Sequence, residues 1–409
     1  MYFLSDYPGK NELLHWWQNR QKDIVYKVNC HIHTPYSFSA FENIRQALDM
    51  AVKEDISILG INDFFVADGY DEFYETALLN QVFPEFNIEF IGLLADEQQR
   101  GIKVNDPSNP GRTYFSGKGL NYPFHVSPDN LQKLNQVKDE SQNQVREMLA
   151  RTNDLLKACN APFIFEFTQL KTDFAKELVR ERHIAKAIRV KINECFPSES
   201  ERLEFLNALY AGKEQKADLN NNILLEEEIR GNLLKAGGAA YVRENEKAFL
   251  PVHEIIEIIV DAGGIPCYPV LLDNKKGEFT GFEEDFNKLA DRLSGLGVGC
   301  VELIPGRNRF ENLLKFVNVM ENRGFLILFG TEHNTPQMMP LTVKASDKVL
   351  DSSLERVAYE GACVVAAHQY LKAKGEEGFT EKSGLARLSE KNEFIRIGKA
   401  VVEKFLSVT

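Results

Sequence analysis

Short apolar runs alternate with amphipathic helical stretches along most of this 409-residue chain. Such runs are typical of buried strands, and helices between them are typical of βα units around a parallel sheet. At least six runs of this kind fit a closed barrel better than a short open sheet. We therefore predict an α/β fold, a closed TIM-like βα barrel with strands over 24–30, 56–61, 88–94, 265–271, 300–304 and 325–329.

The remaining segments predict how the chain is organised around this barrel. The Gly-, Pro- and Asn-rich stretch 96–121 is predicted to be one long loop, and loops of that length are often functional. Helices are expected over 41–54, 70–80, 131–156, 173–192, 252–262, 282–295 and 310–324. We predict a first part of the barrel over 1–127, a helical insertion and candidate lid over 128–250, a second part of the barrel over 251–345, and C-terminal helices over 346–409.

Composition excludes several classes of protein. The net charge of −12 at pH 7 argues against a binding surface for a nucleic acid polymer, but a small anionic substrate in a local pocket remains compatible. The six cysteines lack C-x-x-C spacing and are interpreted as buried thiols in a reducing compartment. Neither a signal peptide nor a membrane span is recognisable, so we expect a cytoplasmic protein that does not bind membranes.

Two histidines, His31 and His33, lie at the end of the first predicted strand. Residues two apart on a strand point the same way, so both imidazoles converge on one point. Such a pair supplies two rigid ligands for a divalent metal ion. The alternative is two polar residues on a solvated strand face, which the apolar neighbours disfavour.

Further polar residues follow the other predicted strands. Imidazole and carboxylate groups are ligands for zinc, manganese or iron, and a metal there favours assisted hydrolysis of a phosphoester. Each group also has a structural alternative, such as a helix cap for Asp63, a packed surface residue for His125, or a local pair for Glu332 and His333. The candidates are Asp63, as ligand or catalytic group, with His125, Glu332 and His333 as ligands, and Arg307 and Arg309 as phosphate-binding residues if they are not simply solvated.

Together these motifs resemble the PHP (polymerase and histidinol phosphatase) superfamily, metal-dependent phosphoesterases on a distorted (β/α)7 barrel. The resemblance spans residues 24–340 in the expected order. The helix that carries His183 is similar to one in nucleoside bisphosphate phosphatase-like members, where an inserted helical domain covers the pocket. The resemblance therefore implies a substrate-contacting role for His183, whereas the residue taken alone is interpreted as an ordinary helix residue. The matching segments are His31-Ile-His33-Thr34, Asn62-Asp63-Phe64, Arg180-Glu-Arg-His183-Ile-Ala, Asp261-Ala-Gly-Gly-Ile-Pro-Cys-Tyr-Pro269, Cys300-Val-Glu302-Leu and Gly330-Thr-Glu332-His333-Asn334.

The chain also departs from the pattern of that superfamily. Phe64, Tyr268 and Asn334 stand where its members have metal-binding histidines. The bridging glutamate expected near 92–94 is absent there, and Asp96 or Glu97 could replace it only if the strand end shifts. These departures imply fewer than three divalent ions.

Three functions therefore compete. The first is a metal-dependent phosphoesterase acting on a small phosphorylated metabolite or nucleotide. The second is a catalytically inactive PHP-fold protein that binds a ligand or partner. The third is an amidohydrolase-like enzyme, which the lack of a bridging lysine and a late catalytic aspartate disfavours.

Overall fold

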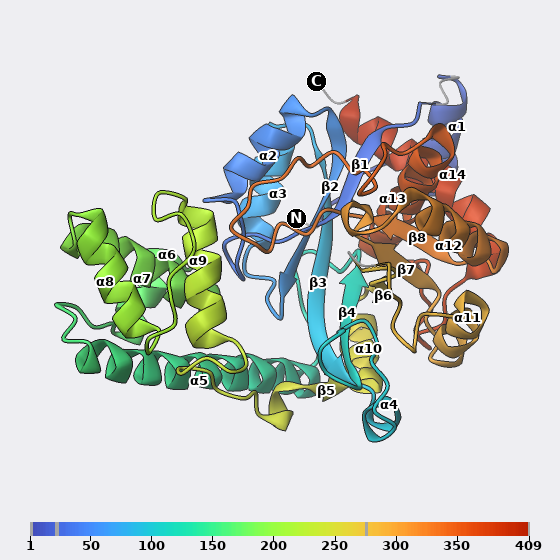
Figure 1. The fold of residues 1–409 in the computed structure, drawn as a ribbon. Coiled ribbons are helices and arrows are strands. Elements are labelled where there is room, and N and C mark those ends of the chain that lie inside the picture. Colours follow the sequence, from blue (N-terminus) through green and yellow to red (C-terminus); the bar gives the residue numbers. More distant parts are fainter. Residues whose placement is uncertain (1–2, 21–23, 275–276, 408–409) are drawn as a thin grey trace.

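A nearly closed, barrel-like sheet forms the centre of the computed structural model, which describes residues 3–20, 24–274 and 277–407 (Figure 1). The strands are hydrogen-bonded in the order β1-β2-β3-β4-β6-β7-β8, and the short strand β5 pairs with β3. The predicted α/β barrel is confirmed. The strands are β1 (Lys27–Ile32), β2 (Ile56–Phe64), β3 (Phe83–Leu93), β4 (Arg112–Lys118), β5 (Leu250–Pro251), β6 (Ile265–Val270), β7 (Cys300–Leu303) and β8 (Leu326–Phe329).

The two ends of this sheet meet at β1 and β8. The backbone N–H groups of Thr331 and Glu332 donate to the carbonyl oxygen of His31 over 3.1 and 2.9 Å, and His33 N–H donates to the carbonyl oxygen of Glu332 over 2.7 Å. Gly330 makes the approach feasible, since a Cβ there would lie 2.3 Å from the Cβ of His31. The end of β1 is therefore held from both sides.

One strand runs against the others. β4 is antiparallel to both neighbours, β3 and β6, whereas the β1–β2–β3 and β6–β7–β8 pairings are parallel. The prediction of one long loop over 96–121 is therefore wrong. That segment contains the short helix α4 (Ala95–Gln99) and β4. The strand lacks an apolar signature because Ser116 and Lys118 alternate along it and both are buried in polar contacts.

Helices cover the sheet and form the C-terminal part of the chain. The helix predicted over 173–192 is confirmed over 181–192, which lie in α7 (Glu181–Cys195), whereas 175–180 are not helical and 173–174 end α6 (Phe167–Phe174). The C-terminal helices pack against each other and against the barrel, with α1 beside α14 (Figure 1). The helices are α1 (Lys10–Gln18), α2 (Ile44–Lys53), α3 (Tyr70–Leu79), α5 (Pro128–Ala158), α6 (Phe167–Phe174), α7 (Glu181–Cys195), α8 (Glu199–Leu209), α9 (Asn222–Ile229), α10 (Val252–Asp261), α11 (Phe286–Gly295), α12 (Phe310–Asn322), α13 (Ser352–Ala373) and α14 (Lys391–Leu406).

The described residues form two hydrophobic clusters. The larger one lies in and around the barrel, and the smaller one lies among helices α5–α9, which extend away from the sheet in Figure 1. Helix α5 bridges them, because Leu134 belongs to the barrel cluster and Leu149 to the helical one. Within the described residues, none of the helices is sufficiently long and apolar to span a membrane.

Candidate metal centre

Strand β1 places His31 and His33 inside the barrel. Their side chains are buried, and their Nε2 atoms lie 3.3 Å apart. Burial lowers the pKa of both imidazoles, so each is neutral at neutral pH and can act as a ligand. The two imidazoles therefore converge on one point, as their spacing in the sequence predicts.

A third group, Glu89, completes the cluster from β3. Its Oε2 lies 3.1 Å from Nε2 of His33 and 3.9 Å from Nε2 of His31. Burial raises the pKa of Glu89 to about 7, and its Oε2 accepts no hydrogen bond within the described part of the chain. Among the described residues, His31, His33 and Glu89 are the histidines and acids whose ligand atoms come close enough together to hold a metal ion.

Glu89 was not among the predicted ligands. The strand was predicted over 88–94, but β3 begins at Phe83, so the carboxylate lies within the strand beside Phe64 of β2 instead of at the strand end. Asp96 and Glu97 lie beyond it on α4, where Glu97 pairs with Arg100. The signal that could have identified Glu89 is the alternation of Glu85, Asn87 and Glu89, whose buried polar side chains share one strand face.

The hydrogen bonds of the two imidazoles determine which nitrogen carries the proton. Nδ1 of His31 lies 3.0 Å from Oε2 of Glu302, and because a carboxylate accepts, Nδ1 donates. Nδ1 of His33 lies 3.3 Å from the hydroxyl of Ser37, which itself donates to Asp63 over 2.5 Å. Since the hydroxyl proton is engaged with Asp63, Ser37 accepts from His33. Both Nε2 atoms therefore present lone pairs.

Three electron-pair donors thus face one point. Ligands at about 2.0–2.1 Å in a tetrahedral zinc site lie roughly 3.3 Å from one another. The separations of 3.1, 3.3 and 3.9 Å match this spacing closely enough for one divalent ion. The donor set, two neutral imidazoles and a carboxylate, fits zinc, manganese or iron. The second imidazole nitrogens are held by Glu302 and Ser37, as is usual for histidine ligands.

The side chain of Asn62 does not compete for this point. Its Nδ2 lies 3.2 Å from Nδ1 and 3.0 Å from Nε2 of His31. Nearly equal distances to both ring nitrogens place the amide over the ring and not along either lone pair. Its Oδ1 accepts from Lys118 over 3.1 Å, which fixes the orientation of the amide.

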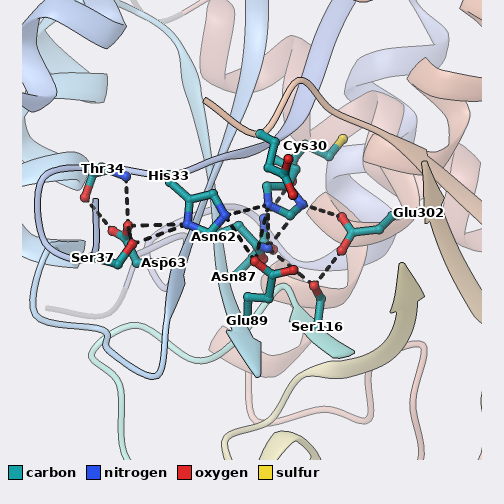
Figure 2. A network of polar contacts seen from close by, with 12 residues as sticks. Cys30, His33, Thr34, Ser37, Asn62, Asp63, Asn87, Glu89, Ser116 and Glu302 are labelled. Carbon is teal, nitrogen blue, oxygen red and sulfur yellow. Dashed lines mark hydrogen bonds and ion pairs between the residues drawn. The ribbon is translucent and has the colours of Figure 1, made fainter. Parts of the chain in front are cut away.

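Asp63 supports the centre from behind. Its carboxylate accepts hydrogen bonds from the backbone N–H of Thr34 over 2.8 Å, from the Thr34 hydroxyl and from Ser37 (Figure 2). Its Oδ1 lies 4.0 Å from Nδ1 of His33, on the side of the ring away from the ligand atom. The structure therefore places Asp63 as a group that positions Ser37 and His33.

Glu332 and His333 lie at the mouth of the barrel but face other partners. Both have left-handed backbone conformations, with φ of 71° and 58°, where the chain turns out of β8. Glu332 forms an ion pair with Arg307. His333 lies 2.9 Å from the Thr331 hydroxyl and 2.8 Å from the carbonyl oxygen of Met339. Neither side chain belongs to the three-atom group.

Two further predicted residues lie apart from it. His125 is exposed and borders a cavity with Gln369 and Lys372 of α13. His183 is buried near the start of α7, where Nδ1 accepts a hydrogen bond from the backbone N–H of Arg180 over 2.9 Å. This bond satisfies one of the free N–H groups at the helix start, so His183 has a capping role.

The departures from the resembling motifs each have a defined place. The ring of Phe64 stacks on His33 at 4.7 Å, and the guanidinium of Arg180 lies over the same ring at 4.8 Å. Tyr268 donates to Glu283 over 2.8 Å within the fold. Asn334 borders a cavity described next.

A cavity of about 610 Å³ opens at the ends of β7 and β8. Arg307, Arg309 and Lys344 border it, together with Glu332 and His333. Arg307 is at the junction of cavity and centre, since it pairs with Glu332 and is close enough for its charge to lower the pKa of His33. The two predicted arginines are thus brought to one cavity beside the metal centre.

Comparisons with known proteins found similar structures but no similar sequence. No family model matches the chain, and no curated protein matches its sequence. Its structure is similar to that of a protein from Bifidobacterium adolescentis described as a metal-dependent phosphoesterase, with 15% identity, a TM-score of 0.49, and coverage of 82% of this chain and 96% of the other. It is also similar to an amidohydrolase from Chromobacterium violaceum with bound sulfate and no metal, with 14% identity, a TM-score of 0.48, and coverage of 78% and 94%.

Proposed function

We propose that this protein is a metal-dependent hydrolase that acts on a small phosphorylated metabolite or nucleotide. The observation that carries the proposal is the convergence of three buried lone-pair atoms, two from His31 and His33 and one from Glu89, with no described donor bonded to the carboxylate oxygen. Such an arrangement is electrostatically unfavourable unless a cation or a proton lies between the atoms. A proton can be shared by only two of these atoms, whereas a divalent cation satisfies all three at once.

The residues of this site would have different roles. His31, His33 and Glu89 would hold the ion, while Glu302 and Ser37 keep both imidazoles in the ligand tautomer. When bound, zinc, manganese or iron supplies Lewis-acid chemistry that activates water and polarises a phosphoryl oxygen. Asp63, expected from sequence as a ligand or catalytic group, would act by fixing Ser37 and thereby His33.

The neighbouring cavity supports an anionic substrate. Its volume of about 610 Å³ is of the size that small-molecule sites have. Among the described residues at its wall, Arg307, Arg309 and Lys344 supply three positive charges against the carboxylate of Glu332. One guanidinium group can donate two parallel hydrogen bonds to two oxygens of a phosphate, so Arg309 and Arg307 would orient the phosphoryl group.

The amidohydrolase alternative has less support. A buried lysine, Lys118, does lie in the barrel, but its Nζ is 2.5 Å from Glu302 and is held there as an ion pair. It is therefore not available to bridge metal ions. The inactive-binder alternative differs from the proposal only in turnover, so the experiment must measure binding and hydrolysis separately.

The test uses the purified full-length protein, loaded with Zn²⁺, Mn²⁺ or Fe²⁺ and assayed for phosphate release from a panel of small phosphate monoesters and nucleotides. We expect bound metal and hydrolysis in the wild type, and loss of both in His33→Ala and Glu89→Gln. Asp96→Asn is the matched control, because this carboxylate is exposed on α4. Metal binding without hydrolysis of any ester would support the inactive binder, and absence of metal binding would overturn the proposal.

A further inference from the structure

A lysine side chain is buried in the middle of the polar barrel interior. Lys118, on β4, has no exposed surface. Its Nζ lies 2.5 Å from Oε2 of Glu302, 3.1 Å from Oδ1 of Asn62 and 3.5 Å from the carbonyl oxygen of Cys30. Three oxygens from three strands therefore surround one ammonium group. Such a set of oxygens is also what a hard divalent cation takes as ligands.

Glu302 is fully engaged by its neighbours. Its Oε1 accepts from the Ser116 hydroxyl over 2.5 Å, while its Oε2 accepts from Lys118 and, over 3.0 Å, from Nδ1 of His31. Figure 2 shows Glu302 and Ser116 on one side of this network and His33 with Asp63 on the other. Glu302 thus faces the back of the His31 ring and not the point where the ligand atoms converge.

The balance of charge explains why a fixed cation is needed here. Glu302 and Glu89 are both buried, and a divalent ion at the three-atom group lies next to only one of them. A second buried carboxylate without a positive partner is strongly unfavourable. Glu85 is also buried, and burial raises its pKa to about 8 despite the nearby thiol of Cys30, so it is neutral at neutral pH.

We propose that the Lys118 ammonium is the second, built-in cation of this centre, so that the barrel holds one divalent ion and Glu302 is kept out of its coordination shell. This inference rests on the proposed function only in that His31, His33 and Glu89 bind a metal ion. Lys118 is then a positioning residue: it fixes Glu302, and Glu302 fixes the tautomer of His31.

The experiment counts ions. Full-length protein is stripped with EDTA, titrated with Mn²⁺, and examined by native mass spectrometry. We expect one ion in the wild type and two in Lys118→Ala, which removes the ammonium and opens its space beside Glu302. Lys118→Met is the matched control: it removes the charge but fills the space, and we expect one ion. Lys118→Ala combined with Glu302→Gln also returns the count to one.

Each outcome separates the inference from the proposed function. Two ions in the wild type, or one ion in a folded Lys118→Ala variant, would overturn the inference and leave the hydrolase proposal intact. No ion in the wild type would overturn both. Should Lys118→Ala fail to fold, anomalous diffraction from Mn²⁺-soaked wild-type crystals decides: we expect one peak between His31, His33 and Glu89, and a second peak on Glu302 refutes the role of Lys118.

Discussion

Removing the positive charge inside the barrel should be among the most destabilising single changes in this protein. Lys118→Met keeps the aliphatic volume but leaves the buried Glu302 carboxylate with only Ser116 and His31 as neutral partners. Breaking a buried ion pair by removing one partner costs about 3–5 kcal/mol, and the amide oxygen of Asn62 loses its donor for about 1 kcal/mol more. Proteins unfold with a free energy of roughly 5–15 kcal/mol, so the loss is a large fraction of the total.

Urea denaturation in the presence of EDTA measures this loss without a contribution from metal binding. With a slope of about 3 kcal/mol/M, the midpoint should fall by more than about 1 M. Lys10→Met is the matched control, because the Lys10–Glu393 pair is exposed and should be worth about 0.5 kcal/mol or less. Adding Glu302→Gln to Lys118→Met should recover most of the stability, since no unpaired charge remains. A cost below about 1 kcal/mol for Lys118→Met, or no recovery in the double variant, would refute the reasoning.

Three further predictions concern the metal, the substrate and pH. Zn²⁺ at 100 times its dissociation constant should stabilise the wild type by about 2.7 kcal/mol and should not stabilise Glu89→Gln, as thermal unfolding will show. In a phosphate-release assay, Arg309→Ala should raise KM several-fold more than it lowers kcat, because the side chain borders the cavity and not the metal centre; the opposite split would contradict its binding role. Burial lowers the pKa of His183 from 6.5 to about 3, so below pH 6.5 the unfolded chain binds a proton that the folded chain does not. This group should therefore lower the free energy of unfolding by up to about 1.4 kcal/mol per pH unit as the pH falls from 6.5 to 3. His183→Asn keeps an acceptor for the backbone N–H of Arg180, so its free energy of unfolding, measured by urea titration at each pH, should decline less steeply.

The barrel could be predicted from the sequence because its strands alternate with amphipathic helices. The pattern failed at β4, where the inward residues Ser116 and Lys118 are polar and the preceding stretch is rich in Gly, Pro and Asn. A search for runs of apolar residues identifies strands whose inner faces are apolar. A strand that lines a polar interior does not satisfy it, although it is as buried as its neighbours.

The candidate site could be predicted only in part for a related reason. The spacing of His31 and His33 identifies two ligands by itself, whereas Glu89 is identified only when the start of β3 is known, because a strand's inner face depends on its register. The roles of Glu302 and Lys118 depend on contacts between strands far apart in the sequence. His125 was favoured by residue type, but its position near α13 depends on tertiary structure that no local pattern records.

Phe64 contributes to how positive charge is held near His33. An imidazole there would offer one more ligand, but the phenyl ring stacks on His33 and provides a face for the Arg180 guanidinium 4.8 Å away. Such a cation–π contact is worth about 0.5–2 kcal/mol, so the ring positions the arginine. Arg180 and Arg307 are both close enough for their charges to lower the pKa of His33. Lys118, Arg180 and Arg307 thus place positive charges on side chains around the single proposed ion. Because side chains stay attached to the protein, anion binding at the mouth should depend less on the concentration of free metal than it would in a site whose positive charge came from several bound ions.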